Sequence, residues 1–83
     1  MFDPERIDPG DRVTVTYASA ITGNDVTREF YVDEMAGGRV YLEPVDARPT
    51  VVSTDGFLQS MVEDAARLSY RPLGTVVDVE VGT

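Results

Sequence analysis

The segment EFYVDEMAGGRVYLEP, Glu29 to Pro44, decides the fold because its pattern predicts a β-hairpin around a glycine turn. Apolar residues alternate along both arms of this hairpin: Val26, Phe30, Val32, Val40 and Leu42. Opposed residues in an antiparallel pair share a face, so we predict that Val32 pairs with Leu42, which leaves 36–38 as a three-residue loop. A turn of two glycines alone would place a carboxylate opposite Val32. Arg28 is the misfit on the inner face, so we expect it at the rim or beside a bulge.

The opposite face of the hairpin carries two tyrosines, Tyr31 and Tyr41, which lie diagonally adjacent in this register. Arg39 lies near them and Met35 lies at the end of the same face. Acidic residues surround the pair: Glu29, Asp33 and Glu43. Two interpretations remain open at this stage. The tyrosines form a binding surface, or the segment 57–68 folds over them and buries them within the chain.

Three further segments show the alternation of apolar and polar residues, or the β-branched composition, that is typical of short strands. They are 12–17 (RVTVTY), 50–54 (TVVST) and 75–81 (TVVDVEV). Residues 1–10 contain two prolines and a glycine, which indicate a polar lead-in that ends in a turn. The alternation of the first and last strands suggests that they pair with each other.

The segment after Asp55 and Gly56 gives conflicting signals. Asp-Gly is typical of a tight hairpin turn, whereas the apolar residues between 57 and 68 recur at helical spacing. We predict a strand over 57–61, then a helical turn over 62–67, and a break in the chain at 71–74.

These segments together predict one mainly β domain over residues 1–83, a small barrel of five to six strands with at most one short helix. An SH3-like barrel is the first hypothesis. An OB-like barrel with a helix before its final strand is the alternative.

The composition is acidic and restricted in its chemistry. Fifteen Asp and Glu residues stand against seven basic residues, all of them Arg, and the net charge is −8. The chain has no Cys and no His, which excludes disulfides, thiolate metal sites and catalysis that depends on histidine. The lead-in lacks the basic and apolar regions of a signal peptide, and no apolar run approaches the roughly 18 residues of a membrane span. We therefore expect a soluble, cytoplasmic protein without membrane contact.

The stretches GDRVTVTY, TGNDVTREF and LGTVVDVEV, within residues 9–44 and 73–81, carry a resemblance to a known group of proteins. The sequence is similar to short proteins of unknown function from extremely halophilic archaea. This resemblance implies a small β-barrel and a haloarchaeal origin, and it transfers no functional residues. The absence of Lys and the excess of acids are typical of halophilic adaptation, because about 1 M salt shortens the Debye length to near 3 Å.

Enzymatic chemistry is not indicated by any motif. The many carboxylates offer pairs for acid and base catalysis, but their abundance makes each pair uninformative, and solvated surface is the default interpretation. Four acids crowd the lead-in, at positions 3, 5, 8 and 11, yet their spacing matches no calcium-binding loop. We expect no catalytic residue, no specific metal site and no cofactor.

The remaining hypothesis is a small binding or adaptor module that recognises another protein, or a second copy of itself, through the outer face of the 25–44 hairpin. Its candidate binding residues are Tyr31, Met35, Arg39 and Tyr41, because tyrosine and arginine are enriched in interface cores. The alternative is a barrel associated with nucleic acid, in which the tyrosines stack on bases. The acids around the tyrosines disfavour phosphate, so nucleic acid ranks second.

Overall fold

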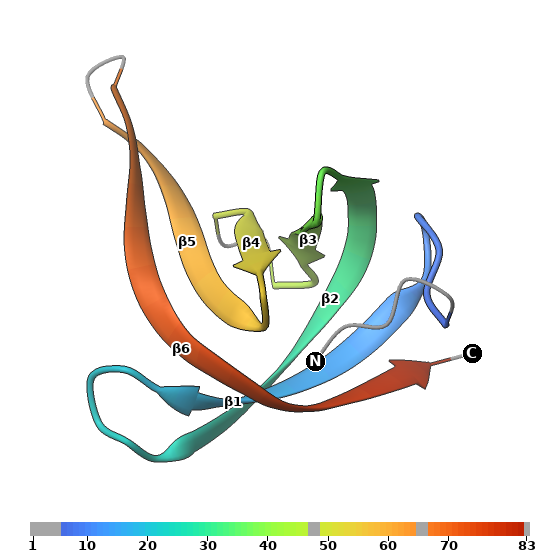
Figure 1. Ribbon diagram of the computed structural model, residues 1–83, viewed down its shortest axis with the longest axis horizontal. Helices are drawn as coiled ribbons and strands as arrows, with labels where there is room; N and C mark the ends of the chain where they lie inside the picture. Colours follow the sequence, from blue (N-terminus) through green and yellow to red (C-terminus); the bar gives the residue numbers. More distant parts are fainter. Residues whose placement is uncertain (1–5, 47–48, 65–66, 83) are drawn as a thin grey trace.

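The computed structural model describes residues 6–46, 49–64 and 67–82, without the side chains of residues 63 and 64. Six antiparallel strands run through these ranges: β1 (Arg12–Ser19), β2 (Asp25–Ala36), β3 (Arg39–Pro44), β4 (Val51–Thr54), β5 (Phe57–Asp64) and β6 (Arg67–Gly82). Each strand pairs with the next in chain order, and β1 pairs with β6, so the sheet closes into a barrel (Figure 1). The predicted small mainly β barrel, with its first and last strands paired, is confirmed. Over the described ranges, no helix has the length and apolar character that crossing a membrane requires.

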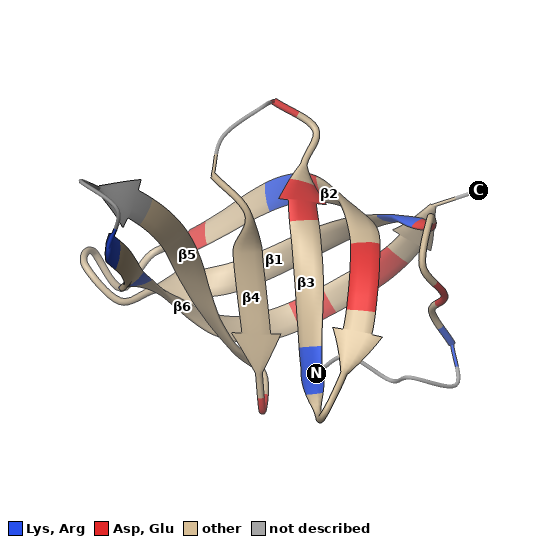
Figure 2. Ribbon diagram, turned by 90° about the horizontal axis from the view of Figure 1, so that it is seen from above, with Lys and Arg blue, Asp and Glu red and all other residues tan. Residues whose placement is uncertain are grey.

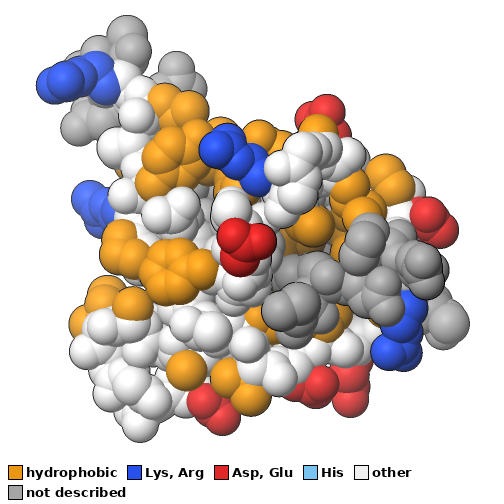
Figure 3. Space-filling view, in the orientation of Figure 1, with side chains coloured by type: hydrophobic (Ala, Val, Ile, Leu, Met, Phe, Trp, Pro, Cys, Tyr) orange, Lys and Arg blue, Asp and Glu red, His pale blue; other side chains and the backbone are white. Residues whose placement is uncertain are grey.

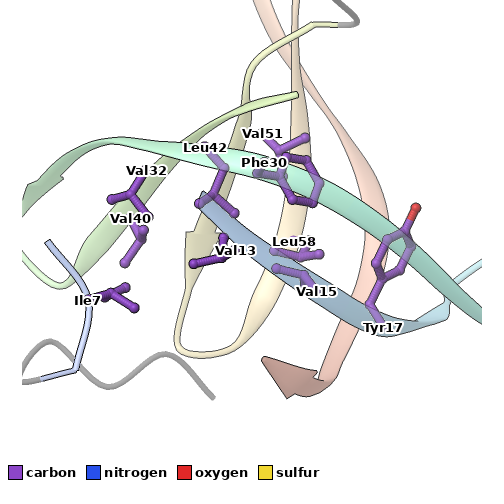
Figure 4. Packing of buried hydrophobic residues seen from close by; sticks show 10 residues of the cluster. All are labelled: Ile7, Val13, Val15, Tyr17, Phe30, Val32, Val40, Leu42, Val51 and Leu58. Carbon is purple, nitrogen blue, oxygen red and sulfur yellow. The ribbon is translucent and has the colours of Figure 1, made fainter. Parts of the chain in front are cut away.

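The core lies inside this barrel and is built from alternate residues of the strands. Ten buried side chains form it: Ile7, Val13, Val15, Tyr17, Phe30, Val32, Val40, Leu42, Val51 and Leu58 (Figure 4). Full burial of a Val, Leu or Phe side chain stabilises the fold by about 1.5–3 kcal/mol. Ile7, from the lead-in, and Tyr17 lie at opposite ends of this cluster in Figure 4. The lead-in therefore contributes to the core at one end, and β1 contributes at the other.

The β2–β3 hairpin has the predicted register but not the predicted loop. Val32 does pair with Leu42, yet Ala36 pairs with Arg39, so the turn contains only two residues, Gly37 and Gly38. Both glycines have positive φ, 60° and 78°, as the tight turns that suit hairpin twist require. A bulge between Val32 and Glu34 adds one residue to β2 and restores the apolar register. The three-residue loop was therefore wrong, because an unbroken ladder was assumed.

The segment after Asp55 is a second hairpin and not a helix. Asp55 and Gly56 both have positive φ, 51° and 79°, and form a tight turn between β4 and β5. The predicted strand over 57–61 is confirmed, but it continues to Asp64, and β6 already begins at Arg67. The predicted helical turn over 62–67 is therefore wrong at its described positions, and residues 65 and 66 lie outside the described residues. The OB-like alternative required a helix before the final strand, and the described residues of 62–67 are in strands instead.

The predicted break at 71–74 is a bulge within the continuous strand β6. Leu58 pairs with Gly74 whereas Gln59 pairs with Pro72, so Leu73 is the extra residue. A Cβ atom placed on Gly74 would lie 1.8 Å from the carbonyl oxygen of Ala18. Only glycine allows β6 to approach β1 this closely, so this position permits the barrel to close.

Candidate binding surface

The two tyrosines of the β2–β3 hairpin lie on its outer face, as predicted. Tyr31 pairs with Glu43, and Tyr41 pairs with Glu34 instead of Asp33 because the bulge shifts the register. Each ring therefore has a carboxylate directly across the strand pair. We call the outward residues Tyr31, Glu34, Arg39, Tyr41 and Glu43 the tyrosine face. Figure 2 shows the acidic segments of β2 and β3 that belong to it.

Residues 57–64 do not lie over the tyrosine face. They form β5, which pairs with β4 and β6 in the barrel wall. Tyr31 remains 43% exposed, so the interpretation in which segment 57–68 buries it does not hold. Tyr41 is half-buried and pairs with Val52 of β4. The side chain of Val52 is also buried, although it is the neighbouring residue, Val51, that belongs to the core cluster. Tyr41 is therefore the fixed member of the pair and Tyr31 the exposed one.

Arg12 of β1 occupies one side of the tyrosine face. It pairs with Tyr31 across the β1–β2 ladder, and its guanidinium carbon lies 5.9 Å from the centre of the Tyr31 ring, within the range of a cation–π contact. The same guanidinium donates a hydrogen bond to the carboxylate of Glu29. The hydrogen bond and the charge of Glu29 raise the pKa of Arg12 above its ordinary value. A cation held between a tyrosine ring and a carboxylate is thus already present at the edge of this face.

The other charged groups of the tyrosine face have few partners. The Glu43 carboxylate accepts a hydrogen bond of 3.3 Å from the Thr50 hydroxyl. Arg39 is exposed, and among the described residues it makes no hydrogen bond or ion pair. Glu34 is also exposed, beside the Tyr41 ring in the register. The centre of this face therefore presents two aromatic rings with carboxylates open to a cationic group.

Met35 does not belong to this face. Its side chain is half-buried and packs against the core, where it pairs with Val40. The bulge after Val32 reverses the inward and outward alternation of the following residues, so a position that alternation places outside is turned inward. The placement of Met35 among the outer binding residues was therefore wrong.

A second feature was not assigned a role by the sequence. Arg28 lies at an inward position of β2, where it pairs with Val15, and it lines a cavity of about 520 Å³. The cavity is also lined by Tyr17, Val26, Thr27, Glu29, Val45 and Asp46. The sequence feature that indicates this cavity is Arg28 itself, a charged residue at an inner-face position of β2 where the neighbouring inner-face residues are apolar.

A further group of exposed apolar side chains lies on β5 and β6, along which Figure 3 shows apolar surface. Its members include Phe57, Leu68 and Tyr70. Tyr70 is 44% exposed and pairs with Met61, far along β6 from the residues that contact β1. It provides an exposed tyrosine outside the tyrosine face.

The described side chains contain no group of three or more acidic residues placed to hold a metal ion. Two of the four lead-in acids, at positions 3 and 5, lie outside the described residues. Comparison of the chain with models of protein families, with curated proteins and with solved structures gave no match.

Proposed function

We propose that this chain is a small non-enzymatic binding module whose tyrosine face takes up basic side chains of a partner protein. The observation that supports this proposal is Arg12, which stacks on Tyr31 and binds the carboxylate of Glu29. An arginine or lysine of a partner would make the same two contacts at the centre of the face, with the Tyr41 ring and the Glu34 carboxylate. Cation–π contact and a charge-assisted hydrogen bond favour the same cation in that position.

The rigidity of the face supports a binding role. Both tyrosines extend from paired strands of a closed barrel, and Tyr41 lies opposite the buried Val52 in the β3–β4 register. A tyrosine on such a scaffold loses little conformational freedom when a partner covers it, so more of its contact energy remains as affinity. Exposed tyrosines of this kind are typical anchors of protein interfaces.

The charge of the chain supports a basic partner. In dilute buffer, a net charge of −8 attracts cationic surfaces from a distance and repels other acidic molecules. We further propose that the protein works in the cytoplasm of an extreme halophile, on the basis of its acidic, lysine-free composition. At about 1 M salt, charges are screened beyond roughly 3 Å, so recognition there would depend on the short-range contacts of the rings.

Nucleic acid is the second candidate, since tyrosine rings also stack on bases. The charges of the tyrosine face oppose it. Arg39 is the one basic residue in this set, against the carboxylates of Glu34 and Glu43. A phosphate backbone would have to approach these carboxylates with Arg39 to offset them, because Arg12 at the edge of the face is already bound to Glu29. The protein partner is therefore the better supported of the two.

The test is a nuclear magnetic resonance titration of the isotope-labelled protein with an arginine-rich peptide, with the same peptide carrying Glu in place of Arg, and with a single-stranded oligonucleotide. We expect the backbone amides of Tyr31, Glu34 and Tyr41 to shift with the arginine-rich peptide alone. Shifts of these amides with the oligonucleotide alone would support the second candidate. Equal shifts with both peptides would contradict the proposal, since the site would then not select for cations.

Variants locate the site within the surface. Tyr41→Ala is expected to weaken binding of the arginine-rich peptide by about tenfold or more, which corresponds to ~1.4 kcal/mol. Glu34→Gln should weaken it less, because the ring contact remains. The control is Tyr70→Ala, which removes from β6 a tyrosine about as exposed as Tyr31 and should leave the affinity unchanged.

A further inference from the structure

The cavity lined by Arg28 is a second candidate site, separate from the tyrosine face. We propose that it binds a small apolar monocarboxylate, whose carboxylate is held by the Arg28 guanidinium and whose hydrocarbon part lies against the apolar wall. The wall residues that would contact the hydrocarbon are Tyr17, Val26 and Val45. The volume of about 520 Å³ is in the ordinary range of small-molecule sites.

The state of Arg28 is the first argument for a ligand. Its side chain is only 14% exposed, and the guanidinium carbon lies 5.1 Å from the centre of the Phe30 ring. Its Nη2 atom is buried and makes no hydrogen bond within the described residues. A guanidinium has five donors, and a buried donor without an acceptor is a rare and unfavourable state in folded proteins. The site therefore lacks an acceptor that a carboxylate would supply.

The nearest acid does not fill this role. The Asp46 Oδ1 atom lies 3.7 Å from Arg28 Nη2, which is an ion-pair distance but too long for a hydrogen bond. The Asp46 side chain is 52% exposed, whereas that of Arg28 is only 14% exposed. The planar fork of arginine matches a carboxylate in a bidentate geometry that Asp46 does not adopt here.

The walls and charges define the class of ligand. Tyr17, Val26 and Val45 line the cavity together with Glu29 and Asp46. The carboxylate of Asp46, whose Oδ1 atom lies 3.7 Å from Arg28 Nη2, would repel a second negative charge on the ligand. A dianion such as phosphate is therefore disfavoured, and a neutral molecule would leave the charge of the guanidinium uncompensated and accept only a weaker hydrogen bond. A single carboxylate on an apolar body satisfies both conditions.

The test uses three probes on the isotope-labelled protein: benzoate, benzyl alcohol as its uncharged counterpart, and inorganic phosphate. We expect benzoate to shift the backbone amides of Val26 and Val45 and the side-chain Nε–H of Arg28. Its dissociation constant should be about tenfold or more below those of the other two probes. If benzyl alcohol binds as tightly as benzoate, or if phosphate does, or if benzoate causes no shifts at these groups, the proposal is overturned.

Variants test the role of the guanidinium. Arg28→Gln should weaken benzoate binding by about tenfold, and Arg28→Lys should weaken it less because the charge remains. Arg71→Gln is the matched control, since it removes an exposed arginine of β6 that lies outside the cavity and should leave the benzoate affinity unchanged. Asp46→Asn leaves Arg28 in place and removes the carboxylate charge that competes with benzoate for the guanidinium. This variant should therefore bind benzoate severalfold more tightly. Unchanged affinity in both Arg28→Gln and Asp46→Asn would show that Arg28 does not hold the carboxylate.

Discussion

Val32 of β2 lies directly opposite Leu42 of β3, although the turn that joins these strands contains only Gly37 and Gly38. The bulge after Val32 makes this pairing compatible with so short a turn. The backbone of Val32 is also fixed from the other side, since its N–H donates to the Asp11 carbonyl at 2.8 Å. The hairpin therefore combines a tight turn with an apolar register, and its bulge determines which outer residues face Tyr41.

The first prediction concerns this turn. Gly38→Val should destabilise the protein by about 1–2 kcal/mol, because a β-branched residue is strained at a φ of 78°. In a domain of this size, 1 kcal/mol lowers the melting temperature by about 4–8 °C. Thermal unfolding followed by circular dichroism measures the change. Gly37→Asn is the matched control, because Asn tolerates positive φ and Asn-Gly is the preferred pair in such turns. An equal loss in both variants would contradict the assigned turn.

The second prediction concerns barrel closure at Gly74. Gly74→Ala should cost about 3 kcal/mol or more, since its Cβ would lie 1.8 Å from the Ala18 carbonyl oxygen and the strands would have to separate. Hydrogen exchange should then show lost protection of the paired amides in β1 and β6. Gly82→Ala serves as the comparison, because its Cβ would meet the Arg12 carbonyl oxygen at 3.2 Å, and the neighbouring backbone can move near the end of the strand. A Gly74→Ala variant with wild-type stability would show that β1 and β6 do not approach as described.

The sequence predicts the barrel because alternation is a local property that each strand shows by itself. It does not predict the bulges at Asp33, Leu73 and Val77, since an inserted residue shows only as a shift in the phase of the alternation, and few residues follow each bulge to reveal that shift. Each bulge reverses the faces that follow it, and this explains why Met35 was placed outside when it packs against the core. The apolar residues of 57–68 match helical spacing by coincidence, and the Asp55-Gly56 turn outweighs it.

The candidate site shows the same division between local and tertiary information. Tyr31 and Tyr41 were found because they lie on one predicted strand pair. Arg12 was missed as their neighbour, since its position beside Tyr31 depends on the pairing of β1 with β2. Arg28 was visible as a misfit on the inner face, but its cavity is formed only when β1, β2 and residues 45–46 come together.

The third prediction separates stability from binding at Arg28. Arg28→Met should leave the free energy of unfolding unchanged or raise it by about 1 kcal/mol, because an apolar side chain of similar length removes a largely buried charge whose Nη2 atom lacks a hydrogen bond. Urea unfolding gives this value, and benzoate binding measured on the same variant should be lost. Unchanged or higher stability together with lost benzoate binding is the result expected if Arg28 serves binding and not folding. A loss of 2 kcal/mol or more would instead indicate, on the scale of about 3–5 kcal/mol for a broken buried pair, that Arg28 is structural.

The fourth prediction concerns Arg12, which competes with the proposed partner for the tyrosine face. Arg12→Gln should tighten binding of the arginine-rich peptide by a few fold, since it frees both the Tyr31 ring and the Glu29 carboxylate for a cation of the partner. Both members of this ion pair are about half exposed, and exposed pairs contribute little to folding, so thermal stability should change little. Glu29→Gln is the informative counterpart, because it loosens Arg12 yet removes a carboxylate, and it should weaken peptide binding. If Arg12→Gln weakens binding of the arginine-rich peptide instead, Arg12 supports the bound state by contacting the peptide or positioning the Tyr31 ring, and the proposed competition is contradicted.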